Sequence, residues 1–374
     1  MPKIQWTVLA GATDITSRVL SMNMTVGREK YLDTYSGGQL NLTINNSANY
    51  AAGITYGTVI RVYSGAFDSG YLCDYWVQEV TFDDYPGNTG LNTATITAVD
   101  WISRAGRVEC TNFVLPQADT SYQMVLFGAA SFGPLPPDMI LLYSTGSSIA
   151  AGITYTGTVN NYMNLLQTTE RGYIIIRGST LAFIPRGYVS GSSPIATTLG
   201  RTTSASQIAY QTFERIQNGV QFINTATVSP NGLASQTSTN SSSVTTYGPA
   251  FYSSSTVDYN TTQASGNADW VVNNFNDPAS LRFGCSLTDV AQNSTALTAW
   301  LTQCWGGYNR TINLSYQVPG GSLTTTPVVM EGASINVTPE STQFAMTFSP
   351  LQYYQFFTLN SNFLGILNTS RLGW

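Results

Sequence analysis

The sequence predicts a mainly β protein with a small α+β part in its middle, and three observations support this class. Apolar and polar residues alternate with a period of two in many short segments, as in half-buried strands. Turn-forming residues separate these segments at intervals of roughly ten residues, a spacing typical of antiparallel barrels and sandwiches. Ser, Thr and Asn outnumber the charged residues roughly threefold in this chain of 374 residues, and such side chains suit sheets and turns.

The first hundred residues carry the clearest strand pattern. Alternation places Leu40, Leu42 and Ile44 on one face of a strand over residues 39–45, and the segment 21–26 repeats the pattern. The remaining elements expected in this region are strands at 59–63, 71–72, 76–82 and 92–99, turns at 64–65 and 83–88, and a brief helix at 100–105.

The composition changes after Cys110. Thr120 is expected to cap a short helix over 121–127, and an amphipathic helix is expected over 161–170, ending at Gly172. A hairpin with strands at 173–176 and 181–184 follows. The chain is therefore divided into three parts, namely a β-domain at 1–110, an α+β insertion at 111–200 and a second β-domain at 201–374.

The β pattern resumes after residue 200. Residues 235–246 are rich in Ser and Thr but lack proline, which favours a polar loop or an exposed hairpin. The other elements expected here are short helices at 268–274 and 295–304 and a strand pair at 334–338 and 343–348.

The absence of histidine from the chain excludes several classes of site. Ser-His-Asp and Cys-His nucleophiles, HExxH metalloprotease sites and most zinc or iron sites all need that residue. A net charge of −5, with lysine only at Lys3 and Lys30, argues against sequence-independent DNA binding. We expect no membrane span and no secretory signal. The four cysteines lie far apart, which favours reduced thiols in a cytosol.

Carboxylates are the remaining candidates for catalysis. Asp83 and Asp84 lie in a turn before Pro86 and Gly87, where exposed Asp is ordinary turn chemistry. A glycosidase-type pair would need a second carboxylate from Asp68 or Asp74. No calcium-loop spacing occurs. We therefore expect no catalytic residue, no cofactor and no metal. The Tyr and Trp residues are expected to be core and interface anchors, the alternative being a carbohydrate-binding platform.

Several phrases in the chain resemble the tail-tip, or baseplate hub, proteins of long-tailed bacteriophages. The segments that carry the resemblance are 14–20, Gly27-Arg28, 37–46, 67–72, 93–100, 165–172, 178–186, 348–350 and 365–374. They occur in the family's order across nearly the whole chain. The pattern departs at Arg171, where the family usually has Gly or a small residue.

The resemblance implies two barrel-like antiparallel β-domains that flank the insertion. It also implies a homotrimer whose six barrels form a ring at the tip of a virion tail. Such a ring joins tube, distal tail and tape-measure proteins to receptor-binding or fibre proteins, and DNA passes through it without specific binding. The chain is then a non-enzymatic structural protein, made in the bacterial cytoplasm. The alternative is a protein that binds or cleaves polysaccharide.

Contacts between such copies need anchor residues. Arginines form bidentate pairs across assembled surfaces, and an apolar C-terminal tag is expected to dock on a neighbouring domain or subunit. The candidate interface residues are Arg18, Arg28, Arg104, Arg371, Leu372 and Trp374.

Overall fold

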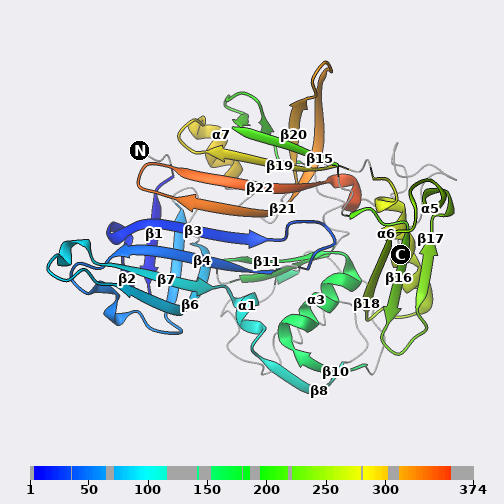
Figure 1. Ribbon diagram of the computed structural model, residues 1–374, viewed down its shortest axis with the longest axis horizontal. Helices are drawn as coiled ribbons and strands as arrows, with labels where there is room; N and C mark the ends of the chain where they lie inside the picture. Colours follow the sequence, from blue (N-terminus) through cyan, green and yellow to red (C-terminus); the bar gives the residue numbers. More distant parts are fainter. Residues whose placement is uncertain are drawn as a thin grey trace.

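The computed structural model describes residues 4–34, 36–64, 71–115, 141–142, 153–178, 180–185, 194–217, 221–278, 281–301 and 311–354. A large, mostly antiparallel sheet dominates the molecule, and helices α3, α5 and α6 lie with smaller sheets at the end remote from the N-terminus (Figure 1). The predicted class, mainly β with an α+β part in the middle, is confirmed.

The large sheet has fourteen strands drawn from both ends of the chain. The first half supplies β1 (Trp6–Ala10), β2 (Thr13–Asp14), β3 (Val19–Gly27), β4 (Ser36–Asn45), β5 (Val59–Ser64), β6 (Tyr71–Asp83) and β7 (Thr93–Val99). The second half supplies β13 (Thr198–Gly200), β14 (Gln207–Ala209), β15 (Thr212–Gln217), β19 (Leu281–Thr288), β20 (Thr311–Gln317), β21 (Leu323–Val337) and β22 (Thr342–Pro350).

Strand β21 joins the two halves because its neighbours change along its length. Residues 323–329 pair with β20, residues 332–337 pair with β3 on the same edge, and β22 pairs along the other edge. The β-regions of the described residues therefore form one branched sheet rather than two closed barrels. The register of β21 against β22 shifts between Met330 and Gly332, so Glu331 is the extra residue of a β-bulge.

The inward faces of this sheet bury one core. The prediction that Leu40, Leu42 and Ile44 lie on one face of β4 is confirmed, and all three are fully buried. The start of the chain is fixed against the C-terminal strands through Asp289, whose carboxylate accepts hydrogen bonds from the backbone N–H groups of Ile4 (3.1 Å) and Thr342 (2.8 Å). Charge-assisted bonds of this kind are roughly twice as strong as neutral ones.

A second core lies under the remaining elements. The strands are β8 (Glu109–Leu115) with β10 (Ile153–Thr158); β9 (Leu141–Leu142), β11 (Tyr173–Arg177) and β12 (Thr180–Ile184); and β16 (Thr225–Pro230), β17 (Gln236–Thr239) and β18 (Phe251–Thr256). The α-helices of the described residues are α1 (Trp101–Ala105), α3 (Val159–Glu170), α5 (Ser241–Tyr247), α6 (Thr261–Phe275) and α7 (Ser294–Trp300), of which α7 lies against the large sheet.

Helix α3 shows why the sequence departs from the expected pattern at Arg171. The Thr158 side chain caps its N-terminus by accepting from the N–H of Asn161. At its C-terminus, Arg171 has φ +57°, and its N–H donates to the Gln167 carbonyl. This left-handed conformation normally favours Gly, so Arg171 keeps the backbone role of the small residue and adds a buried side chain.

Most expected elements of the described residues are present. The hairpin of β11 and β12 is confirmed, as is the antiparallel pairing of β21 with β22. Strand β6 is continuous where two strands were expected. The prediction of a polar loop or exposed hairpin over 235–246 is correct for its first part, since β17 forms an antiparallel hairpin with β16. It is wrong for the second part, where α5 forms; Asn240 caps this helix by accepting from the N–H of Ser243. The helix expected at 121–127 lies outside the described residues, and the division at residues 110 and 200 stays a prediction.

Asp100 fixes the junction between the sheet and α1. It caps the helix by accepting from the N–H of Ser103 (3.0 Å) and accepts from the N–H of Gly38 in β4 (2.6 Å). Burial raises the pKa of this carboxyl to about 6, although these hydrogen bonds favour its charged form.

A pH-dependent contribution to stability follows from the raised pKa of Asp100. The folded protein holds the proton up to about pH 6, whereas the unfolded chain releases it near the ordinary value of 3.8. The free energy of unfolding should therefore fall by about 2 kcal/mol as the pH rises from 4 to 6. Because Asp100→Asn carries no titrating group, its stability relative to wild type should rise over that interval. Urea unfolding at several pH values measures this, and a constant difference would contradict it.

Candidate functional site

A buried ion pair lies where β3 leaves the sheet. Arg28 follows β3, and its Nε donates to Glu331 Oε2 over 2.8 Å. Its Nη2 donates to the Tyr354 hydroxyl over 2.9 Å, and this hydroxyl donates to Glu331 Oε1 over 2.7 Å. The three side chains form a closed ring of hydrogen bonds that joins β3, β21 and the 3₁₀ turn η6 (Leu351–Tyr354).

The pair is almost completely removed from water, since the side chains of Arg28 and Glu331 are 4% and 3% exposed. Burial by itself lowers the pKa of Arg28, but the adjacent Glu331 carboxylate more than offsets this and holds the pKa above its ordinary value. Burial, reinforced by the same carboxylate, raises the pKa of Tyr354 well above its usual range. Arg28 is therefore charged and Tyr354 is a neutral donor near neutral pH.

Two glycines allow the backbones to meet at this point. Gly27 has φ +93°, and a Cβ built on it would lie 2.3 Å from the Glu331 carbonyl oxygen. A Cβ on Gly332 would lie 2.5 Å from the Arg28 carbonyl oxygen. Both distances are too short for non-bonded atoms. Glycine at both positions, together with the bulge at Glu331, therefore places the acid beside the arginine.

Further contacts connect the ring of Arg28, Glu331 and Tyr354, here called the Arg28 cluster, to the second core. The guanidinium of Arg28 lies over the Tyr31 ring, 4.8 Å from its centroid, and the Tyr31 hydroxyl donates to the Arg171 carbonyl over 2.8 Å. The Arg171 guanidinium donates in turn to the Tyr252 hydroxyl (3.0 Å) and the Ser254 hydroxyl (3.4 Å). A continuous polar path thus runs from the large sheet through the end of α3 to β18.

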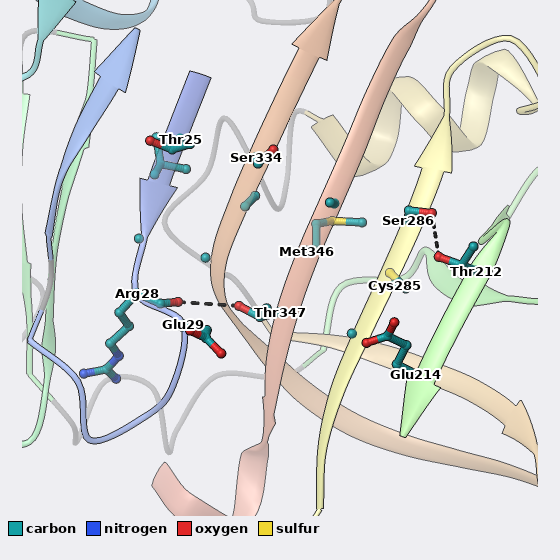
Figure 2. A pocket seen from close by; sticks show the side chains of 16 residues that line it. Thr25, Arg28, Glu29, Thr212, Glu214, Cys285, Ser286, Ser334, Met346 and Thr347 are labelled. Carbon is teal, nitrogen blue, oxygen red and sulfur yellow. Dashed lines mark hydrogen bonds between the residues drawn. The ribbon is translucent and has the colours of Figure 1, made fainter. Parts of the chain in front are cut away.

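A groove of about 520 Å³ crosses β3, β21, β22, β19 and β15 beside this cluster. Many of the residues that line it are small, among them Gly284, Ser286, Ser334 and Ala345. Figure 2 shows Glu29 and Glu214 at the same end of the groove, and the guanidinium of Arg28 pointing away from it.

The groove offers little chemistry. Glu29 accepts from Arg282 over 2.8 Å, and this hydrogen bond lowers the pKa of its carboxyl. Burial raises the pKa of the Cys285 thiol far above neutrality, so the reactive thiolate is scarce. Within the part of the chain that the structure describes, the groove therefore contains no activated nucleophile. Its small, weakly charged floor suits contact with another surface better than catalysis.

The predicted interface residues have different surroundings. Arg18 is half-buried, with its guanidinium 3.9 Å from the centroid of the Tyr50 ring and its Nη2 2.5 Å from the Tyr50 hydroxyl. Arg104 is half-buried over the Trp76 ring. Arg28 is engaged within the chain, as described above. The other three candidates, Arg371, Leu372 and Trp374, lie outside the described residues.

The structure does not bring the candidate carboxylates together. Asp83 ends β6 and Asp84 follows it in an exposed turn. Asp74 lies nine residues earlier on the same strand, about 30 Å away by strand geometry, and it pairs with Arg61 over 3.4 Å. Asp68 lies outside the described residues. The spacing required of a glycosidase pair, below about 10 Å, is therefore not met by Asp74 with either turn residue.

No group of three or more Cys, Asp or Glu side chains in the described ranges is placed to hold a metal ion. None of the helices in those ranges has both the length and the apolar character needed to cross a bilayer. Cys73, Cys110 and Cys285 are buried free thiols.

Sequence reasoning singled out Arg28 but missed its partners. Glu331 and Tyr354 lie about 300 residues further along the chain, beyond the range of any periodicity. The available signal was local: each charged residue of the pair adjoins a glycine, in Gly27-Arg28 and Glu331-Gly332. A glycine inside a strand pattern often marks a bulge or a close backbone approach.

Solved structures of other proteins share this architecture, although comparisons of the sequence find no match. No protein-family model matches the chain, and no curated protein matches it. A tail protein from Neisseria meningitidis MC58 has a similar structure, with a TM-score of 0.65, 10% identity and coverage of 93% of this chain and 96% of that one. The 43 kDa tail protein of prophage MuSo2 from Shewanella oneidensis gives 0.61 and 11%, with coverage of 94% and 99%.

A third solved structure is similar over a smaller part of its own length. The Escherichia coli c3393 protein has a TM-score of 0.52 at 8% identity, with coverage of 89% of this chain and 73% of that one. It is described as a component of the type VI secretion system with structural similarity to the T4 tail proteins gp27 and gp5. At these identities the likeness concerns the fold, and the chain has the fold that these tail and secretion-system proteins share.

Proposed function

We propose that this chain is a structural protein of a phage-type tail and that three copies form the hub ring at the tail tip. The observation that carries the proposal is the extent of the fold similarity: two phage tail proteins share the architecture over at least 93% of this chain and 96% of their own.

The described surface is suited to contacts between copies. Strand β15 pairs only with β19 among the described strands, so its other edge offers backbone N–H and C=O groups to a neighbour. Large apolar side chains are exposed near the β6–β7 hairpin and near Arg18, among them Phe82, Leu91, Leu20 and Tyr50. Exposed aromatic and aliphatic residues of this size are typical anchors of protein interfaces.

In this proposal the ring connects the tail tube to the host-adhesion apparatus. Its neighbours are tube, distal tail and tape-measure proteins on one side and receptor-binding or fibre proteins on the other. The chain has only fifteen Lys and Arg residues and a net charge of −5, which suits the wall of a channel that DNA crosses without being retained. The protein belongs to the virion tail after synthesis in the bacterial cytoplasm.

The mass of the purified chain in solution tests the assembly. Three chains of 40.4 kDa give a particle of about 121 kDa, and native mass spectrometry at micromolar concentration is expected to show this species. The residues proposed for the interface offer a direct control: Leu20→Glu, at an exposed site, should shift the particle toward 40.4 kDa while circular dichroism stays unchanged. A wild-type chain that is monomeric at all concentrations would contradict the proposal.

A further inference from the structure

A long stretch of the chain carries no charge. No Asp, Glu, Lys or Arg occurs between Arg215 and Asp258, a run of 42 residues. Even with 9% charged residues in the whole chain, roughly four would be expected in this run. The run includes α5 and all three strands of the β17–β16–β18 sheet, so these elements supply no charged side chain of their own.

The strand register places hydroxyl side chains in rows on one face of this sheet. Thr227 of the central strand is paired with Thr237 on one side and with Ser253 on the other. The Thr227 and Thr237 hydroxyls are 3.0 Å apart, and those of Ser229 and Ser235 are 2.9 Å apart in the next row. With neighbouring strands about 4.8 Å apart, the rows form an array of groups that both donate and accept.

Phe251 interrupts the array at one corner. It is paired with Thr225, lies on the same face and is 76% exposed, the largest exposure of any large apolar side chain in the described residues. The opposite face of the sheet is covered, because Ala226 and Val228 are buried in the second core with residues of α6. The face that carries the Thr and Ser hydroxyls and Phe251 is therefore the side of this sheet that is open to a partner. We call it the hydroxyl face.

The residue types of the hydroxyl face limit the class of molecule that it can bind. Nucleic acids and anionic lipids need Lys and Arg, which are absent here. Protein interfaces are depleted in Ser, and their energetic centres are poor in Ser and Thr. A neutral partner rich in hydroxyls fits, because each Ser or Thr hydroxyl both donates to and accepts from such a ligand. An exposed aromatic ring adds a surface on which the polarised C–H groups of a sugar ring stack.

We propose that the hydroxyl face binds a neutral glycan, with the Thr and Ser hydroxyls bonding to the sugar hydroxyls and Phe251 stacking against a sugar ring. This is a binding activity, without bond cleavage. It is separate from the tail-ring proposal, since it depends on a small sheet that lies apart from the large one (Figure 1).

The test uses the purified full chain with three neutral hexasaccharides, maltohexaose, cellohexaose and chitohexaose, and measures binding by saturation-transfer NMR and calorimetry. At least one is expected to bind with a dissociation constant of about 1 mM or below. Phe251→Ala should weaken that binding about tenfold, and Thr237→Val should also weaken it. The matched controls are Tyr56→Ala, at an exposed aromatic position outside the proposed interface, and Thr324→Val, at an exposed position on β21; both should bind as wild type does.

Each of the following outcomes would contradict the proposal that the hydroxyl face binds a neutral glycan. Binding of none of the three sugars would do so, as would binding that Phe251→Ala and Thr237→Val leave unchanged. Retention of a sulfated oligosaccharide or of duplex DNA in place of the neutral sugars would assign the chain a charged ligand. Loss of the oligomer in Phe251→Ala would assign the face to contacts between copies. Because Phe251→Ala is expected to leave the particle mass unchanged, failure of the glycan site can be told apart from failure of the tail-ring proposal.

Discussion

Replacing Arg28 by methionine is expected to lower the free energy of unfolding by about 3–5 kcal/mol, the cost of leaving one partner of a buried ion pair uncompensated. The Glu331 carboxylate, which is 3% exposed, would lose the guanidinium and keep the hydrogen bond from the Tyr354 hydroxyl. Methionine fills most of the volume of the arginine stem, so the loss arises from charge rather than from a cavity. Urea unfolding followed by tryptophan fluorescence measures the difference.

The double variant Arg28→Met/Glu331→Met separates this effect from loss of packing. Because it removes both charges, it should be clearly more stable than Arg28→Met alone. The control is Arg282→Met, which breaks the ion pair with the largely exposed Glu29 and should cost less than about 1 kcal/mol. If Arg28→Met costs no more than Arg282→Met, the buried pair does not stabilise the junction of β3, β21 and η6.

Replacing Gly332 by alanine is expected to cost about 3 kcal/mol, because the added Cβ has no room. It would lie 2.5 Å from the Arg28 carbonyl oxygen and 3.1 Å from both the Arg28 nitrogen and the Val26 carbonyl oxygen. All three are backbone atoms, so rotation of a side chain cannot relieve the overlap and β3 must move away from β21. Forced displacement in a packed interior costs typically 1–3 kcal/mol and sometimes more.

Gly53→Ala is the matched control for this substitution. No heavy atom lies within 4 Å of a Cβ at Gly53, and its φ is not positive. This variant should therefore change the stability by less than about 1 kcal/mol. Chemical denaturation of the two variants beside wild type gives the comparison. Equal stabilities for Gly332→Ala and Gly53→Ala would show that β3 and β21 are not held at the close approach described.

The elements that the sequence predicts correctly are those whose pattern is local. The alternation around Leu42 and the hairpin of β11 and β12 depend on neighbours a few residues apart, and both are present. Helix α5 was missed because Ser and Thr have weak helix propensity. Its formation depends on a cap from Asn240 and on a hydrogen bond from Ser243 to the carbonyl of Asn276, 33 residues away.

The candidate site was predictable only in part. Arg28 stood out because it follows a glycine inside a strand pattern, yet its ion pair with Glu331 spans 303 residues. The bulge that points Glu331 inward is a property of pairing between β21 and β22, which no single segment encodes. Likewise, the uncharged run after Arg215 was visible in the sequence, but only the register of β16 with its neighbours turns it into rows on one face.

The central claim is that copies of this chain assemble into a ring, and electron microscopy of the purified particle tests it most directly. Threefold rings with an axial hole are expected in end-on views. Single compact particles without rotational symmetry, or closed oligomers lacking a central hole, would contradict it.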